Sequence, residues 1–125
     1  MAEYYIVSIK HTHRRDLYIT VWRPNDSGYA YPLSWAGLYA EDLMLAKLGY
    51  YNSGCSAVAV PCEVFDRIAV PPSPGMIDND AGPVVFNNAK SWRAIRAGVI
   101  MPPAHPIVPE FTGARRLTTE KAVQS

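Results

Sequence analysis

The chain has 125 residues, of which 49% are hydrophobic and 18% are charged, and this is the balance of a folded domain rather than of a disordered chain. Its 12 basic and 11 acidic side chains leave a net charge of +1, which argues against a broad basic face that would hold DNA or RNA. A single domain of this length buries about two-thirds of the surface of its unfolded chain, which is enough for one core.

The N-terminal residues lack the basic region and the apolar run of a signal peptide, and no apolar stretch approaches the roughly 20 residues of a membrane-spanning helix. Only two cysteines occur, Cys55 and Cys62, whereas a small secreted domain often carries a disulfide framework. We therefore expect a cytoplasmic protein that does not enter a membrane, with both cysteines as reduced thiols.

Three segments rich in aromatic and β-branched residues predict an antiparallel meander at the start of the chain. They span residues 4–10, 17–23 and 29–35, and one face of the first segment is wholly apolar. A polar loop at 11–16 separates the first two segments, and a turn rich in Pro, Asn, Asp and Gly at 24–28 separates the last two.

Helical spacing begins near residue 40, where two acidic residues favour a helix N-terminus, and Gly49 is a natural stop. Residues 57–60 form a short apolar run that is typical of a buried strand. Two alternatives remain for the next segment. Either Pro61 opens a short helix, or the strand continues past a bulge through residues 62–64.

Four prolines and two glycines argue against regular structure between residues 71 and 83. Residues 84–86 suit an edge strand. Asn87 or Asn88 then caps a helix whose last residues precede Gly98, and its apolar residues recur at helical spacing.

These elements predict a single α+β domain over residues 1–101. It contains a small antiparallel sheet, made of the N-terminal three-stranded meander plus one or two further strands, together with two or three short helices. Residues 102–125 are rich in proline and polar side chains and predict an extended C-terminal tail that is mobile or docks on a partner.

Residue types that serve in catalytic and metal sites occur here without the usual spacing. An H-x-H pair would need further ligands, and the pair and its candidate partners are His11, His13, Cys55, Cys62, Asp78 and Asp80. The C-x6-C spacing matches no standard zinc pattern, and Cys62 stands beside apolar residues, where a thiol is usually inert. We assign no catalytic residue, no metal ligand and no cofactor, and we favour a non-enzymatic function.

The feature that departs most from an ordinary surface is the aromatic and polar segment at residues 22–31, with a second such group at 50–52. Aromatic rings stack on a flat base and an arginine fork binds phosphate, so the segment suits a nucleotide-like ligand. The same residue types also occur in protein–protein hot spots, and they also simply cover small sheets. The candidate ligand-binding residues are Trp22, Arg23, Asn25, Tyr29, Tyr31, Tyr50, Tyr51 and Asn52.

The segments WRPNDSGY, GYYNSG, VAVPCEV and GPVVFNN resemble small uncharacterised accessory proteins of bacteriophages and prophages. The resemblance covers most of residues 4–97 and carries over no catalytic residue. It implies a protein that acts in the host bacterial cytoplasm by binding, either to a bacterial defence protein or to the nucleotide second messenger that activates one.

The resulting prediction is a non-enzymatic phage or prophage accessory protein that inhibits a bacterial defence system, by occluding a defence protein or by sequestering its nucleotide signal. One alternative is a small enzyme that modifies or cleaves a nucleotide, and another is a structural or assembly protein. We expect a homo-oligomer, most simply a dimer, because closed two-fold contacts are the commonest kind.

Overall fold

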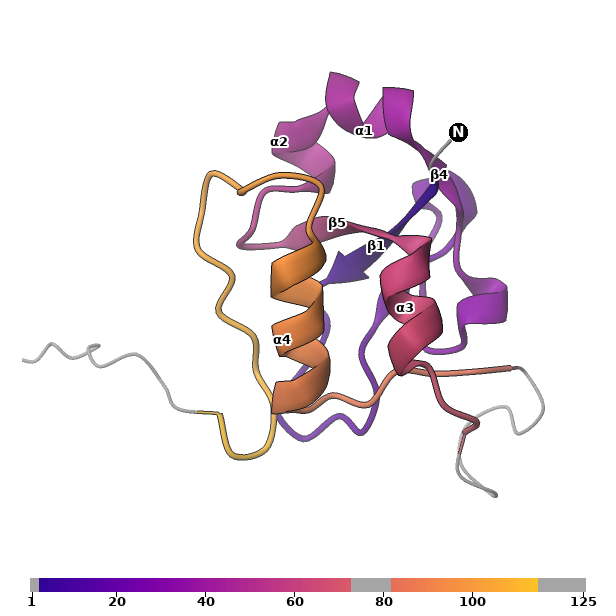
Figure 1. Cartoon of the computed structure of the whole chain (residues 1–125), viewed down its shortest axis with the longest axis vertical. Coiled ribbons are helices and arrows are strands. Elements are labelled where there is room, and N and C mark those ends of the chain that lie inside the picture. The colour runs from indigo at the N-terminus through magenta and orange to yellow at the C-terminus, as the bar shows by residue number, and fades with distance from the viewer. Residues whose placement is uncertain (1–2, 73–81, 115–125) are drawn as a thin grey trace, which may run out of the picture.

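The computed structural model describes residues 3–72 and 82–114, and within them it contains an antiparallel sheet of five strands. The central strand is β1 (Glu3–Ser8), which pairs along its length with β5 (Ala57–Pro61) (Figure 1). The opposite edge of β1 is shared by β2 (Val21–Trp22) and β4 (Tyr39–Ala40), and β3 (Tyr29–Ala30) pairs with β2. The predicted α+β class is confirmed, and β1, β2 and β3 form the predicted meander with its second and third strands reduced to two residues each.

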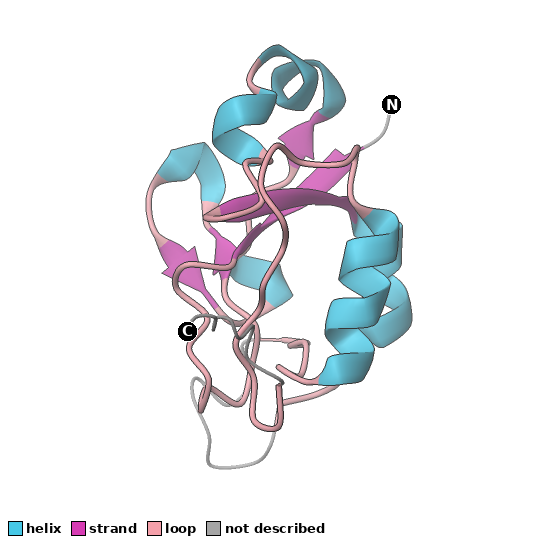
Figure 2. Ribbon diagram, turned by 90° about the vertical axis from the view of Figure 1, so that its left-hand side faces the viewer, coloured by secondary structure: helices cyan, strands magenta, loops and turns pink. Residues whose placement is uncertain are grey.

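Both faces of the sheet are covered, and the two groups of helices lie on either side of it (Figure 2). The helices are α1 (Glu41–Ala46), α2 (Leu48–Tyr51), α3 (Cys62–Ile68) and α4 (Ala89–Gly98). On one face, Val7 of β1 and Val58 of β5 belong to a core that includes residues of α3 and α4. On the other face, Ile6 and Ala59 pack with residues of α1 and α2. Alternation along the two paired strands therefore divides the core into two halves.

The first predicted helix is broken at Lys47, whose backbone (φ −136°, ψ 47°) leaves the helical region between α1 and α2. Gly49 lies inside α2, so the prediction that Gly49 ends the helix is wrong. The break turns α2 so that Tyr51 is buried against the sheet, and tertiary packing has overridden the local stop signal.

Of the two alternatives after Pro61, the helix is correct, and Pro61 itself closes β5 and caps α3. Asn88 is the N-cap of α4, and its side chain accepts a hydrogen bond from the Ser91 N–H at 2.9 Å. The predicted edge strand at 84–86 is reduced to isolated bridges, in which Tyr18 pairs with Phe86 and Val70 pairs with Val84.

Asn87 connects three parts of the molecule. Its Nδ2 group donates to the backbone carbonyls of His13, Asp16 and Glu110 at 3.0–3.1 Å, and its Oδ1 accepts from the Trp92 indole at 2.6 Å. The residue is buried, so these partners replace the water that its amide would otherwise bind.

The first part of the predicted tail lies against the domain. Ile107 is buried in the core that also contains residues of α3 and α4, and Arg14 forms an ion pair of 3.2 Å with Glu110. The His105 N–H donates to the Ser53 carbonyl at 3.0 Å. Residues 115–125 of the predicted tail lie outside the described residues, as do Asp78 and Asp80. In the described residues, no helix combines the length and the apolarity that crossing a bilayer would require.

Candidate ligand-binding site

The two aromatic groups identified in the sequence form one continuous row of rings. The Trp22 ring lies at the centre, with centroids 6.5 Å from Tyr29, 5.4 Å from Tyr50 and 5.7 Å from Tyr51. Tyr29 faces Trp22 across the β2–β3 pair, whereas Tyr50 and Tyr51 come from α2. Tyr51 is buried and also contacts Tyr39, while Tyr29 and Tyr50 are exposed. The row therefore has a half-buried centre in Trp22, a buried ring in Tyr51, and two exposed rings in Tyr29 and Tyr50.

Asn52, the last of the predicted ligand-binding residues, has both ends of its amide engaged within the chain. It is buried, its Oδ1 accepts from the Ala59 N–H at 3.0 Å, and its Nδ2 donates to the Met101 carbonyl at 2.9 Å. The Ala59 carbonyl accepts from the Ile100 N–H at 2.9 Å. Asn52 and Ile100 therefore hydrogen-bond the N–H and the carbonyl of Ala59 on the outer edge of β5. This gives Asn52 a structural role at that edge.

A hollow of about 430 Å³, here called the Tyr29 hollow, opens beside β3. Three aromatic rings line it, those of Tyr29, Tyr31 and Trp35, together with the side chains of His11 and Asp16. The volume lies within the range of small-molecule sites in proteins. The hollow therefore combines flat apolar walls with a few polar groups, which is the composition that fixes a ring-bearing ligand.

Local hydrogen bonds hold the His11 ring in place. Its Nδ1 lies 3.0 Å from the Ser8 hydroxyl, and the same hydroxyl accepts from the His11 N–H at 3.1 Å. The ring stacks on Tyr29 with centroids 4.1 Å apart and planes inclined by 29°. Since Ser8 is a buried residue of β1, the sheet itself orients this imidazole.

Two further side chains set the polar character of the hollow. The Asp16 carboxylate accepts from the His13 N–H at 2.8 Å and remains exposed enough to accept a further donor. Burial raises the pKa of the Tyr31 phenol, Asp16 adds to this effect and a hydrogen bond to Thr20 opposes it. Tyr31 is consequently a neutral hydroxyl at physiological pH.

Arg23 stands at the end of β2, next to the hollow rather than in its wall. Its Cζ lies 5.5 Å from the centroid of the Trp35 ring, and Trp35 does line the hollow. The Arg23 backbone is fixed on both sides, because its N–H donates to the Gly28 carbonyl at 2.8 Å and its carbonyl accepts from the Tyr39 hydroxyl at 2.5 Å. An exposed cation on a fixed backbone is thus placed over one aromatic wall.

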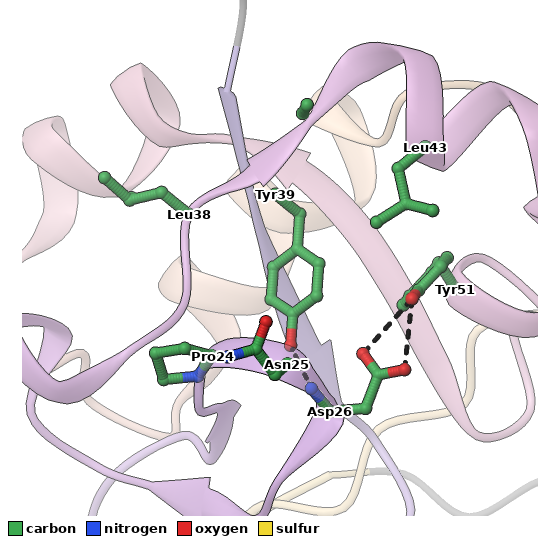
Figure 3. A pocket seen from close by; sticks show the side chains of 8 residues that line it. Pro24, Asn25, Asp26, Leu38, Tyr39, Leu43 and Tyr51 are labelled. Atoms are coloured by element: carbon green, nitrogen blue, oxygen red, sulfur yellow. Dashed lines mark hydrogen bonds between the residues drawn. The ribbon is translucent and has the colours of Figure 1, made fainter.

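The turn after Arg23 forms one side of a second pocket of about 390 Å³, here called the Asp26 pocket (Figure 3). Tyr51 places its hydroxyl 3.1 Å from each Asp26 carboxylate oxygen, and the Asp26 N–H donates to the Tyr39 hydroxyl at 3.1 Å. Burial, followed by the hydrogen bond to Asp26, raises the pKa of Tyr51 to about 12. Of the predicted residues, Asn25 and Tyr51 line this pocket, whereas Tyr29 and Tyr31 line the Tyr29 hollow.

The described groups that were considered for catalysis and metal binding do not form such a site. In the part of the chain that the structure describes, no three His, Cys, Asp or Glu side chains are grouped as a metal site requires. Cys55 and Cys62 are both free. Burial, together with the nearby Glu3 and Asp66, raises the pKa of Cys62 to about 11, so the group is a thiol and a weak nucleophile at neutral pH.

Sequence reasoning did not select Trp35, His11 or Asp26 as ligand-binding residues. His11 and Tyr29 are distant in sequence, and their rings meet only in the fold, where the loop after β1 lies against β3. Trp35 stood in a predicted strand but belongs to a 3-10 turn, Leu33–Trp35, that turns its ring toward the hollow. A signal was present for Asp26, since consecutive Asn and Asp residues after a proline favour left-handed backbone in a turn.

Comparisons with known proteins give no match to this chain among family models, curated proteins or solved structures.

Proposed function

We propose that the protein binds a flat, ring-bearing anion, of which a nucleotide is the simplest example, in the Tyr29 hollow. The observation that carries this proposal is the arrangement of exposed aromatic walls with Arg23 lying over one of them. Stacking of a base on an aromatic ring contributes about 1–3 kcal/mol, and a charge-assisted hydrogen bond contributes about 1.5–3 kcal/mol. A ligand of roughly 20 non-hydrogen atoms at about 0.3 kcal/mol per atom would bind with about 6 kcal/mol, which corresponds to a Kd of tens of micromolar.

Within the setting that the phage resemblance implies, such binding would serve to sequester a nucleotide signal of a bacterial defence system. The protein would act without turnover, as an accessory inhibitor in the host cytoplasm. Support comes from the neutral Cys62 thiol, and from the burial of Ser8, because the hydroxyl that lies 3.0 Å from the His11 ring is closed off from an incoming ligand. Occlusion of a defence protein is the other mode, and the same experiments separate the two.

The first test is a thermal-shift and calorimetric titration of the full chain with AMP, cyclic AMP and ADP-ribose. A ligand present at 100 times its Kd raises the free energy of unfolding by about 2.7 kcal/mol, which moves the melting temperature of a domain of this size by several degrees. Adenosine, which lacks the phosphate, and ribose 5-phosphate, which lacks the base, should both bind more weakly. The proposal is wrong if none of these nucleotides shifts the melting temperature or releases heat.

A pair of variants locates the site. Tyr29 and Tyr50 are exposed to similar degrees, 47% and 54%, and both contact Trp22, but only Tyr29 lines the hollow. Tyr29→Ala should weaken nucleotide binding tenfold or more, while Tyr50→Ala should leave it unchanged. An equal loss of nucleotide affinity in the two variants would indicate that the ligand binds to the whole Trp22 row rather than in the Tyr29 hollow.

Turnover distinguishes the enzymatic alternative. A binding protein returns intact nucleotide after denaturation, whereas an enzyme returns product, and chromatography of the released ligand separates these results. Recovery of a host defence protein with the tagged chain, combined with no nucleotide binding, would favour occlusion.

We also propose that the protein is a homo-oligomer. Support comes from three exposed hydrophobic side chains on the first helical pair, Leu43 and Leu45 of α1 and Tyr50 of α2. Size-exclusion chromatography with light scattering should give the mass of a dimer. The mass of one chain at the highest accessible concentration would contradict this expectation.

A further inference from the structure

The Asp26 pocket is distinct from the Tyr29 hollow, because no residue lines both. The residue 24–26 turn lines the Asp26 pocket alone, and the walls of this pocket combine three kinds of side chain. Leu38 and Leu43 form apolar walls, Tyr39 and Tyr51 contribute phenol rings, and Asp26 contributes the one charge among the lining residues (Figure 3).

Hydrogen bonds within the pocket already use the O–H and N–H donors of its polar residues, and they leave oxygen acceptors available to a ligand. The Tyr51 O–H is directed to the Asp26 carboxylate, the Tyr39 O–H donates to the Arg23 carbonyl, and the Asp26 N–H donates to the Tyr39 oxygen. A carboxylate has about four acceptor positions and a phenol oxygen keeps lone pairs after donating its proton. Apart from the Asn25 amide, which offers both a donor and an acceptor, the polar lining therefore presents acceptors to an incoming ligand.

The backbone that displays these acceptors is held in an unusual conformation. Asn25 and Asp26 have φ angles of 60° and 57°, the left-handed region that glycine adopts at no steric cost. The chain instead places two polar side chains there, and the Tyr39 and Tyr51 hydroxyls hold the second of them in position. A conformation that costs free energy and is fixed by tertiary contacts is a recurrent property of binding sites.

We propose that the Asp26 pocket binds an arginine side chain of a partner protein. A guanidinium group carries five N–H donors and no acceptor, which complements a lining of acceptors around one carboxylate. The apolar stem of arginine fits between walls such as Leu38 and Leu43, and the planar head is weakly hydrated and packs against phenol rings. Leu38 is 55% exposed, so the pocket opens at the surface where a partner chain can reach it.

The experiment titrates the full-length chain with N-acetyl-arginine methylamide and follows the methyl resonances of Leu38 and Leu43 by NMR. The corresponding citrulline derivative is the control ligand, because it has nearly the same shape and no charge. We expect saturable shifts of these methyl groups with the arginine probe and an affinity at least tenfold weaker for the citrulline probe.

Asp26→Asn removes the charge while it keeps an oxygen that accepts from Tyr51 and a side chain that tolerates left-handed backbone. The matched control is Asp66→Asn, which removes the same charge from an exposed position on α3. Binding of the arginine probe should fall tenfold or more in the first variant and stay unchanged in the second. An unchanged melting temperature establishes that Asp26→Asn is folded.

Three results would overturn the proposal: no shift of the Leu38 and Leu43 methyl groups up to the solubility limit of the arginine probe, equal affinity for citrulline, or normal binding by Asp26→Asn. The outcome is separate from that for the Tyr29 hollow, since the two sites have different lining residues and different probes. A failure of nucleotide binding would leave these methyl shifts as they are.

Discussion

Arg23 is the residue on which the nucleotide proposal depends most. Arg23→Ala should weaken nucleotide binding by roughly 1.5–3 kcal/mol, which is tenfold or more in Kd, because a charge-assisted contact is lost. Folding should change little, since an exposed arginine over a tryptophan contributes at most about 1 kcal/mol. Calorimetric titration and thermal unfolding measure the two effects.

Arg23→Lys is the informative companion of that variant. It keeps the charge and loses the planar fork, so it should bind nucleotide with an intermediate affinity. If Arg23→Ala lowers the melting temperature and leaves binding intact, the guanidinium serves only to cover Trp35.

Tyr51 should make the fold sensitive to alkali. Its pKa is about 12 in the folded chain, above the ordinary value of 10, so the folded state keeps the proton over an interval in which the unfolded state has lost it. Stability is therefore fully present below pH 10 and falls as the pH rises from 10 to 12. Thermal unfolding at a series of alkaline pH values measures this decline.

Tyr51→Phe provides the control for the alkaline decline. Loss of the hydrogen bond to Asp26 should lower the stability at neutral pH by about 1 kcal/mol. The decline above pH 10 should become shallower without vanishing, because burial also raises the pKa of Tyr4, Tyr5 and Tyr39. If the decline of stability above pH 10 is as steep in Tyr51→Phe as in the wild type, the other phenols cause it.

Among the elements, α4 depends on its cap. Asn88→Ala should lower the free energy of unfolding by about 1 kcal/mol, because the Ser91 N–H at the first turn loses its acceptor. Urea unfolding should give a lower midpoint with an unchanged slope. Asn88→Asp and Asn88→Ser keep an acceptor and should restore most of the stability, and if they fail to do so the loss has another cause.

Local patterns predicted those elements whose partners are close in sequence or whose faces are regular. The alternation in β1 and the apolar run of β5 both follow from burial in a sheet, and the cap and length of α4 follow from its own residues. The break at Lys47 was not predictable in this way, because it depends on the packing of Tyr51 against strand residues that are distant in the sequence. The same reason explains why Asn52 was taken for a ligand-binding residue, since its partners Ala59 and Met101 are set by the tertiary fold.

On the scale of the whole molecule, the C-terminal segment is held against the domain at a glycine. A Cβ atom at Gly54 (φ +93°) would lie 1.9 Å from the His105 carbonyl oxygen, whereas one at Gly113 (φ +94°) would meet nothing within 4 Å. An alanine at either position would be strained by the left-handed backbone. Only at Gly54 would its Cβ atom also clash with the His105 carbonyl oxygen.

Gly113→Ala should accordingly cost about 1 kcal/mol from its left-handed backbone alone. Gly54→Ala should cost roughly 1–3 kcal/mol more, because the segment around His105 must move away. Chemical unfolding of both variants measures the difference, and equal losses would show that the segment contributes nothing to stability.

Closure of the β5 edge by Asn52 and Ile100 also protects the molecule from polymerisation. The strand β5 (AVAVP) is apolar and uncharged, and a strand edge with free N–H and C=O groups is a template for pairing with another chain. An incoming strand would need the N–H and the carbonyl of Ala59. The N–H already donates to the Asn52 side chain, and the carbonyl already accepts from Ile100 in the chain after α4. Detachment of the chain after α4 during heating would expose this edge, so we expect thermal unfolding to become irreversible once Ile100 has left the sheet.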